Sequence, residues 1–488
     1  MQYTSIRSLH LLSQFIRCCF AMILPVSLLA QQTTDLISQP TKKVEVVFSS
    51  ANGQKLLDRQ QVNISVAPLA KVLPVIRVDT TKVFQTIDGF GFTLTEASAF
   101  LINRMPQASR EKLLQELFGT GVEAASISYL RIGLGATDLS TKVYSYDDML
   151  PGETDPQLRR FSLAQDTVNM IPLLKAILRI NPKISIMATP WSPPAWMKDN
   201  NSTIGGSLLS KYYPVYARYF VEYIRQMKSE GIRIDAVTIQ NEPQNAHNNP
   251  SLKMEASEQA AFIRDHLGPA FRRNGITTKI IIWDHNCDMP EFPLSVLADR
   301  KANPYIDGSA FHLYGGQPEA MSKVRDAYPD KHIYFTEQWT GSKGDFGGDL
   351  LWHFKNVLIG SLRNWSRTVL EWNLANDAGF GPHTPGGCSE CKGALTIDGS
   401  AIQKNVSYYV IAHASKFIPP GSVRIASSEV QGIPSVAFKT PEGKIVLLLM
   451  NDSGKIQKVG IEAAGHHVQL ELQSGLVATV QFTISYEK

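Results

Sequence analysis

The sequence predicts an α/β protein, in which a (β/α)8 TIM barrel is combined with a β-sandwich formed from the two ends of the chain. From about residue 85 to residue 415, short apolar, β-branched runs alternate with amphipathic helical windows. On both sides of this region, polar and apolar residues alternate between Gly and Asn/Asp turns, as in antiparallel strands. A chain of 488 residues is also long enough for one large domain and one smaller domain.

Eight strand candidates in the central region predict the barrel. They span residues 84–92, 127–134, 184–189, 234–240, 279–283, 308–314, 333–336 and 368–372. The helical windows between them span residues 108–118, 163–179, 209–230, 257–273 and 349–362. A doubly wound sheet is the alternative, but Gly89-Phe90-Gly91-Phe92 lacks the third glycine of a dinucleotide-binding loop. Eight strands that alternate with helices favour the closed barrel.

The flanking segments predict the sandwich and set the expected domain bounds. Strand-like runs lie at residues 44–48 and 75–78 before the barrel, and at 435–438, 445–450 and 477–484 after it. We expect a signal peptide at 1–30, sandwich strands at 31–82, the barrel at 83–415 and the rest of the sandwich at 416–488.

The N-terminus predicts export. Arg7 and Arg17 precede an apolar run, Cys18 to Ala30, and a polar segment follows. This run suits the h-region of a secretory signal and is short for a bilayer span. We expect a secreted, periplasmic or cell-surface protein that is cleaved after Ala30, with a retained membrane anchor as the alternative.

Composition and cysteine spacing exclude several classes of protein. A net charge of +4 without a basic cluster argues against nucleic-acid binding, and no segment implies an obligate protein partner. Cys388 and Cys391 form a C-x-x-C pair, but a zinc site would need a second pair. We expect a local disulfide between Cys388 and Cys391 and a free, buried thiol at Cys287.

Polar and aromatic residues gather at the predicted carboxyl ends of the strands, where TIM barrels carry their chemistry. They include Asp138, Trp191, Asn241, Glu242, Asp284, His285, His312, Tyr314, Glu337, Trp339, Glu371 and Trp372. Aromatic faces stack on the C–H faces of a pyranose ring, while carboxylates and amides bind hydroxyl groups. The barrel mouth therefore suits a sugar.

Glu242 and Glu337 are the expected catalytic pair. They end strands four and seven, so their side chains can converge across the mouth. One carboxyl group protonates the leaving oxygen and the other attacks the anomeric carbon; a separation of roughly 5 Å leaves no room for a water molecule and dictates retention. We assign Glu242 as general acid/base and Glu337 as nucleophile, and expect the charge of Glu337 to raise the pKa of Glu242. Either glutamate alone could be an ordinary strand-end residue.

Supporting roles are expected for several neighbours. Arg131 should face the barrel interior, where a buried guanidinium must be paired, and Glu337 is its expected partner. His312 is expected to support the site through hydrogen bonds rather than as a proton shuttle. Asp284 and His285 could indicate a metal, but they stand apart from other ligands and are expected to be supporting residues. We expect no metal site.

The three tryptophans have two interpretations. Trp191 and Trp372 are expected to contact the sugar, although core packing is the usual place of a tryptophan. For Trp339 both interpretations stay open.

Seven motifs together resemble glycoside hydrolase family 30, which includes glucosylceramidases and endo-β-1,6-glucanases. They are residues 88–91 (DGFG), 129–133 (YLRIG), 190–198 (PWSPPAWMK), 241–243 (NEP), 335–337 (FTE), 372–374 (WNL) and 415–422 (SKFIPPGS). The resemblance covers about residues 85–425 and implies a barrel with a sandwich built from both chain ends. It implies that Glu242 is the acid/base, that Glu337 is the nucleophile and that Asn241 binds the sugar 2-hydroxyl. Tyr314 and Arg131 are implied to flank the nucleophile.

The resemblance also bears on the substrate. It implies that Asp138, Trp191 and Trp372 hold a non-reducing glucose. Leu313 departs from the glucosylceramidases, which have an aromatic residue there, and the loop 379–392 is more similar to the β-1,6-glucanase-type members. The implied substrate is a β-glucoside, as a glucan, an oligosaccharide or a glycolipid.

The expected function is therefore that of a retaining β-glycosidase that hydrolyses β-glucosidic bonds and needs no cofactor. The same machinery acting on xylan or a fucoside is one alternative. A catalytically inactive carbohydrate-binding barrel is another, although such a barrel would usually have lost one carboxylate.

Overall fold

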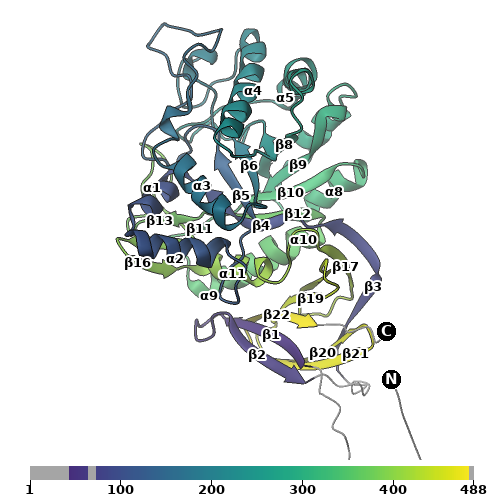
Figure 1. Ribbon diagram of the computed structural model, residues 1–488. Coiled ribbons are helices and arrows are strands. Elements are labelled where there is room, and N and C mark those ends of the chain that lie inside the picture. The colour runs from purple at the N-terminus through teal and green to yellow at the C-terminus, as the bar shows by residue number, and fades with distance from the viewer. Residues whose placement is uncertain (1–42, 64–72, 483–488) are drawn as a thin grey trace, which may run out of the picture. The chain divides into compact units, whose positions relative to one another are not determined.

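The computed structural model describes residues 43–63 and 73–482 (Figure 1). The expected signal peptide at 1–30 lies outside the described residues. None of the helices in the described ranges is both long enough and apolar enough to cross a membrane.

Within these ranges, eight parallel strands close into a barrel in the order β10-β12-β4-β5-β6-β7-β8-β9. They are β4 (Gly89–Leu94), β5 (Tyr129–Gly133), β6 (Ser185–Thr189), β7 (Ala236–Thr238), β8 (Lys279–Asn286), β9 (Ile306–His312), β10 (His332–Glu337) and β12 (Ser366–Asn373). The predicted (β/α)8 barrel is confirmed, and the doubly wound alternative is excluded by the closure of β4 on β12. Side chains from seven of the eight strands form a buried cluster, which includes Tyr129, Met187, Ile281 and Tyr334.

The first strand candidate, residues 84–92, was wrong as a single strand. The chain forms β3 (Val75–Thr86), which belongs to the sandwich, and then β4 in the barrel. Between them Asp88 pairs with Arg367 at 2.6 Å, and Gly89 has a φ of +151° and packs on Ser128. The apolar pattern runs through this turn because the residues on both sides are buried, whereas Asp88-Gly89 marks the break.

Helices cover the outside of the barrel. They are α1 (Glu96–Arg104), α2 (Gln107–Phe118), α3 (Met170–Ile180), α4 (Tyr213–Ser229), α5 (Ala256–Phe262), α6 (Gly268–Arg273), α7 (Glu291–Ala298), α8 (Glu319–Ala327), α9 (Phe346–Trp352), α10 (Ser361–Arg363) and α11 (Val406–Ser415). Each predicted helical window contains a helix. The windows at 257–273 and 349–362 are continued through π-helical turns at Ile263–Leu267 and His353–Gly360. The shorter helices α1, α7 and α8 were not predicted.

The ends of the chain build a second sheet, which confirms the predicted sandwich. Within the described ranges its nine strands have the order β2-β1-β22-β19-β18-β17-β3-β20-β21. The remaining bounds are β1 (Lys43–Ser50), β2 (Asp58–Asn63), β17 (Val423–Ser427), β18 (Ser435–Lys439), β19 (Ile445–Met450), β20 (Gln457–Ala463), β21 (His466–Leu472) and β22 (Leu476–Phe482). β1 pairs antiparallel with β22, so the two ends of the described chain share one hydrophobic core.

A buried histidine links the barrel helix α11 to the sandwich. His413 Nδ1 lies 2.8 Å from Thr479 Oγ1 on β22, and Nε2 lies 2.9 Å from Ser49 Oγ on β1. Because the Thr479 hydroxyl donates to the His413 carbonyl oxygen, it accepts from Nδ1–H, and Nε2 then accepts from Ser49. Burial and the charge of Lys416 lower the pKa of His413 to about 3. The imidazole is therefore neutral in the folded protein.

Replacing His413 with Ala is expected to destabilise the protein by roughly 2–4 kcal/mol, because it leaves a cavity and removes one hydrogen bond from each of the buried Thr479 and Ser49 hydroxyl groups. The folded-state pKa lies below that of an unfolded histidine, about 6.5, so the unfolded chain takes up the proton first. Stability should fall as pH drops below about 6.5, and this component of the pH dependence should vanish in His413→Ala. Urea unfolding at pH 7 and pH 5 measures both effects. Exposed His247→Ala is the control, and an unchanged pH dependence in His413→Ala would contradict the assignment.

Candidate active site

A cavity of about 550 Å³ opens at the carboxyl ends of the barrel strands. Its lining comprises Asp138, Trp191, Asn241, Glu242, Gln244, Asn245, His247, Asn248, His285, Asn286, Tyr314, Glu337, Trp339, Trp372, Cys388 and Cys391. The structure thus brings together at one cavity all the residues predicted to bind substrate or to act as catalytic groups. Arg131 and His312 lie buried beneath it.

The two glutamates face each other at the base of this cavity. Glu337 ends β10, and Glu242 follows β7 by four residues. Glu242 has a φ of +45°, which is rare for a residue with a side chain, and its backbone N–H donates to the Asp284 carbonyl oxygen at 3.0 Å. One oxygen of each glutamate lies within 4.8 Å of an oxygen of the other. The two carboxyl groups therefore lie closer together than the roughly 6.5–9.5 Å at which a pair of carboxyl groups activates a water molecule on the opposite face of a sugar ring.

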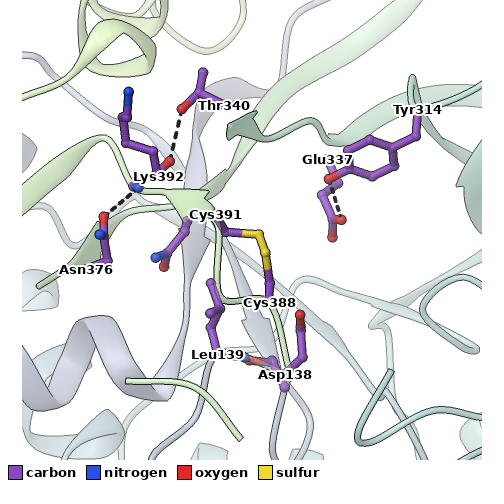
Figure 2. Close-up of a disulfide and its surroundings, with 12 residues drawn as sticks. Asp138, Leu139, Tyr314, Glu337, Thr340, Asn376, Cys388, Cys391 and Lys392 are labelled. Carbon is purple, nitrogen blue, oxygen red and sulfur yellow. Dashed lines mark hydrogen bonds between the residues drawn. A yellow bond between two sulfur atoms is a disulfide. The ribbon is translucent and has the colours of Figure 1, made fainter. Parts of the chain in front are cut away.

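Both oxygens of Glu337 are held by hydrogen bonds. Arg131 Nη1 donates to Oε2 at 2.5 Å, and the Tyr314 hydroxyl donates to Oε1 at 2.9 Å (Figure 2). Arg131 also donates from Nη2 to Asn241 Oδ1 at 2.6 Å. Asn241 therefore keeps its amide N–H groups for a ligand. The expected pairing of Arg131 with Glu337 is present.

Asp284 connects the buried polar groups under the cavity. Its Oδ2 accepts from Arg131 Nη2 at 2.9 Å and from Thr238 at 2.8 Å, and its Oδ1 lies 3.1 Å from His312 Nε2 and 2.7 Å from Thr336 Oγ1. Asp284 lies at a bulge in β8, where its backbone has a φ of +65°. This local geometry turns the Asp284 side chain into the network. The expected supporting role of Asp284 fits these contacts, but nothing in its sequence position indicated four partners.

His312 carries the positive charge next to Glu242. Burial would lower the pKa of His312, but the charge of Glu337 and hydrogen bonds to Asp284 and Glu242 raise it to about 9. Its Nδ1 lies 3.2 Å from Glu242 Oε1. Both ring nitrogens are therefore donors at neutral pH.

The expected raised pKa of Glu242 is wrong. Burial favours the neutral acid, but the hydrogen bond from His312, the charges of His312 and His285 and a hydrogen bond from Asn245 lower the pKa to about 2. The proton that Glu337 was expected to place on Glu242 resides instead on His312. The sequence analysis considered the two glutamates and left out the charge of the histidine between them.

The pKa values of the Glu337 and Asp138 carboxyl groups are both raised. Burial raises the pKa of Glu337 against the opposing charges of His312 and Arg131. For Asp138, burial and the charges of Glu337 and Glu242 raise the pKa to about 7. At neutral pH Asp138 thus exists in both forms, and it can donate to or accept from a hydroxyl group.

Aromatic rings form the wall beside Asp138. Trp191 and Trp372 lie with ring centroids 5.4 Å apart, and the Arg131 guanidinium stacks 4.8 Å from the Trp191 ring. Although both tryptophans are almost fully buried in the ligand-free state, both line the cavity, as does Trp339. Trp191 and Trp372 therefore form part of the cavity wall and are packed in the interior at the same time.

The sequence analysis missed a polar wall that follows Glu242. Gln244, Asn245, His247 and Asn248 line the cavity, and Asn245 Nδ2 donates to Glu242 Oε2 at 2.7 Å. The amide-rich run directly after Asn241-Glu242-Pro243 was the available indication. It supplies donors and acceptors to the cavity beside Glu242.

Glu242, His312 and Glu337 could in principle hold a metal ion, since one ligand atom of each lies within 4.8 Å of the others. The donor set fits a metal poorly. A charged His312 has no free lone pair, and both oxygens of Glu337 already accept hydrogen bonds, from Arg131 and Tyr314. The cluster is better suited to proton transfer.

Cys388 and Cys391 form a disulfide at the edge of the cavity, next to Asp138 (Figure 2). Cys287 is buried and free. The disulfide loop is thus part of the cavity wall.

Comparisons with known proteins agree with this geometry. The sequence model of the glycosyl hydrolase family 30 TIM-barrel domain matches residues 87–418, and that of the family 30 β-sandwich domain matches residues 421–480. An endo-1,6-β-D-glucanase of Neurospora crassa is 34% identical over 413 residues, which cover 80% of this chain and 83% of that protein. The lysosomal acid glucosylceramidase of Mus musculus is 29% identical over 414 residues, covering 78% of each chain.

Solved structures give the same result. An endo-β1,6-glucanase superposes with a TM-score of 0.85 at 34% identity, covering 91% of this chain and all of that chain. The protein SrfJ of Salmonella typhimurium also superposes with a TM-score of 0.85, at 27% identity and the same coverage. The chain therefore belongs to glycosyl hydrolase family 30 and is a glycoside hydrolase.

Proposed function

We propose that this protein hydrolyses β-glucosidic bonds with retention, with Glu337 as nucleophile and Glu242 as general acid/base. The observation that carries the proposal is the approach of the two carboxyl groups to within 4.8 Å. Retaining glycosidases separate their carboxyl groups by about 5–5.5 Å, whereas inverting enzymes need room for a water molecule.

The contacts of Glu337 fit a nucleophile. Arg131 holds Oε2 and Tyr314 holds Oε1, so the carboxylate is fixed in orientation and its charge is stabilised. Oε1 attacks the anomeric carbon as the glycosidic oxygen leaves, and a glucosyl ester forms. The N–H groups of Asn241 bind the sugar 2-hydroxyl beside this bond.

The contacts of Glu242 fit a general acid that shares its proton with His312. His312 Nδ1 passes the proton to Glu242 Oε1 across 3.2 Å as negative charge develops on the leaving oxygen, and Glu242 protonates that oxygen. In the second half-reaction Glu242 accepts a proton from water, which attacks the ester and releases the sugar, and Glu242 returns this proton to His312 Nδ1. His312 thus relays the proton and sets the proton affinity of Glu242, a role that was not expected from the sequence.

This arrangement predicts a basic limb in the pH profile. Below its pKa of about 9 His312 is charged, so kcat/KM for an aryl β-glucoside should fall as pH rises through about 9. In His312→Gln the positive charge that lowers the pKa of Glu242 is gone. The fall in kcat/KM should then follow the pKa of Glu242 itself and no longer lie near pH 9. Profiles of kcat/KM from pH 5 to pH 10 measure the shift.

His285→Gln is the matched control for this profile. His285 Nε2 lies 3.9 Å from Glu242 Oε1, beyond hydrogen-bond distance. Its removal should leave the limb near pH 9. A limb that stays in place in His312→Gln would refute the shared proton.

For the substrate we propose a β-1,6-linked glucan or its oligosaccharides. The relatives at 34% identity are named endo-1,6-β-glucanases, and the glucosylceramidase of Mus musculus is 29% identical. The polar wall of Gln244, Asn245, His247 and Asn248 suits a leaving group rich in hydroxyls better than a ceramide. A lipid glucoside is the second candidate because of the family relationship, and a xylan or fucoside would have no obvious use for Asp138.

The test is a substrate panel of β-1,6-glucan, gentio-oligosaccharides, glucosylceramide in detergent micelles, xylan and aryl β-glucosides, β-xylosides and β-fucosides. Turnover of β-1,6-glucan with a β-configured first product, observed by proton NMR, supports the proposal. Turnover of glucosylceramide alone overturns the glucan assignment. An α-configured first product overturns retention, and sugar binding without any turnover supports an inactive barrel.

We further propose that the protein is exported. The disulfide between Cys388 and Cys391 and the signal-like segment at 1–30 support this location, because disulfides persist in oxidising compartments. Fractionation of the source cells and N-terminal sequencing of the purified protein test it. Recovery in the cytoplasm with Met1 intact would refute it.

A further inference from the structure

The disulfide loop, residues 382–392, contacts two sides of the active-site mouth. On one side the Thr384 backbone N–H donates to the Asp138 carbonyl oxygen at 2.9 Å, and the Thr384 hydroxyl donates to the Asn249 carbonyl oxygen. Gly387 lies so close to Asp138 that a Cβ atom there would stand 2.3 Å from its carbonyl oxygen. The first half of the loop is thus packed against the backbone of Asp138.

The other end of the loop is fixed to the segment that follows the strand of the nucleophile. β14 (Cys391–Lys392) pairs with β11 (Thr340–Gly341), which begins three residues after Glu337. The Ser342 backbone N–H donates to the Glu390 carbonyl oxygen at 2.8 Å, and the Thr340 hydroxyl donates to the Lys392 carbonyl oxygen at 3.0 Å. Cys391 is 5% exposed and packs with Leu139, Trp191 and Trp372.

The disulfide joins these two halves at Asp138. Cys388 lies beside the Asp138 carboxyl group (Figure 2), and its backbone lowers the pKa of that group against the larger raising effects of burial and of the charges of Glu337 and Glu242. Between the two fixed ends, Pro385, Gly386 and Ser389 are exposed, so the tip of the loop has no apolar packing of its own. The bond from Cys388 to buried Cys391 therefore holds the tip in place.

We propose that the Cys388–Cys391 disulfide is a positioning element for substrate binding, which fixes the Asp138 carboxyl group at the sugar site. The inference rests on the proposed function, because it takes Asp138 as a ligand of the sugar. A carboxyl group that binds a hydroxyl must be held to within a fraction of an ångström, and a displacement of 1 Å can cost about a hundredfold in rate. Breaking the disulfide releases Asp138 and leaves Glu337 on β10 and Glu242 in the segment after β7.

The test compares the oxidised and reduced protein. Dithiothreitol transfers two electrons and two protons, so that the disulfide becomes two thiols and the reagent becomes a cyclic disulfide. On a gentio-oligosaccharide, reduction is expected to lower kcat/KM about tenfold or more. The Cys388→Ser/Cys391→Ser variant should have the same low value without dithiothreitol and no response to it.

A double-mutant cycle separates positioning of Asp138 from general loosening of the protein. In Asp138→Asn the sugar contact is already weakened, so reduction should lower kcat/KM by less than about twofold. A loss equal to that of the parent protein would show that the disulfide acts elsewhere and would overturn the inference. The inference would also be overturned if the reduced parent protein, with both thiols verified by mass, kept a kcat/KM within about twofold of that of the oxidised form.

Hydrogen exchange gives a readout that needs no turnover. Peptides covering residues 134–141 should exchange faster after reduction, while those of β10 keep their protection. Unchanged exchange at 134–141 overturns the inference even if the glycosidase proposal stands. Conversely, the parent protein could cleave no β-glucoside while reduction still speeds hydrogen exchange at residues 134–141. This result would refute the proposed function but support the link between the disulfide and Asp138.

Discussion

Replacement of Glu337 with Ala is expected to lower kcat for an aryl β-glucoside by at least about ten-thousandfold, because the nucleophile is lost. Sodium azide should restore part of the activity, since the small anion fits the space left by the carboxyl group. Azide attacks the β-glucoside from the face that Glu337 used, so the product should be the α-glucosyl azide. Its configuration, measured by NMR, identifies the residue as the nucleophile.

Glu371→Gln is the matched control for this experiment. Glu371 is a buried carboxyl group near the end of the neighbouring strand β12, and it pairs with His353 at 2.7 Å away from the cavity lining. This variant should keep most of the parent's kcat and show no response to azide. A β-configured azide from Glu337→Ala, or an equal loss in Glu371→Gln, would contradict the assignment.

Replacement of Glu242 with Ala is expected to act selectively on poor leaving groups. For β-1,6-glucan, whose leaving sugar needs a proton, kcat/KM should fall by about a thousandfold or more. For a 2,4-dinitrophenyl β-glucoside, whose leaving group departs as a stable anion, the first half-reaction needs no acid and kcat/KM should fall far less. The contrast between the two substrates measures general acid catalysis directly.

Azide again distinguishes the two glutamates. In Glu242→Ala the glucosyl ester on Glu337 still forms, and azide attacks it in place of water, so the product should be the β-glucosyl azide. An equal loss on both substrates, or an α-configured azide, would mean that Glu242 is not the acid/base.

The barrel and the residues at its mouth could be predicted because their pattern is periodic. Six of the eight barrel strands end in a polar residue, and the closed topology brings the strand ends together. This is why Asp138, Asn241 and Glu337 could be selected without coordinates. Where two adjacent strands are both buried, as at Thr86 and Gly89, periodicity could not separate them.

The proton distribution could not be predicted, because it depends on distances between residues remote in sequence. His312 stands between Glu242 and Asp284 only after the bulge in β8 has turned Asp284 inward. The contact of Thr384 with Asp138 likewise joins residues 246 positions apart. Loop contacts of this kind have no sequence period.

The pairing of β1 with β22 also constrains when the protein can fold. Residues 43–50 pair with the nearby strand β2 on one side but find their partner on the other side only at residues 476–482, so one edge of β1 has no native neighbour until almost the whole chain has been synthesised. Contacts of such long range form slowly, because the closure of a long loop must precede them. Until then, β1 presents an apolar edge open to wrong partners, and a nascent chain is at its greatest risk of aggregation just before its last strand emerges.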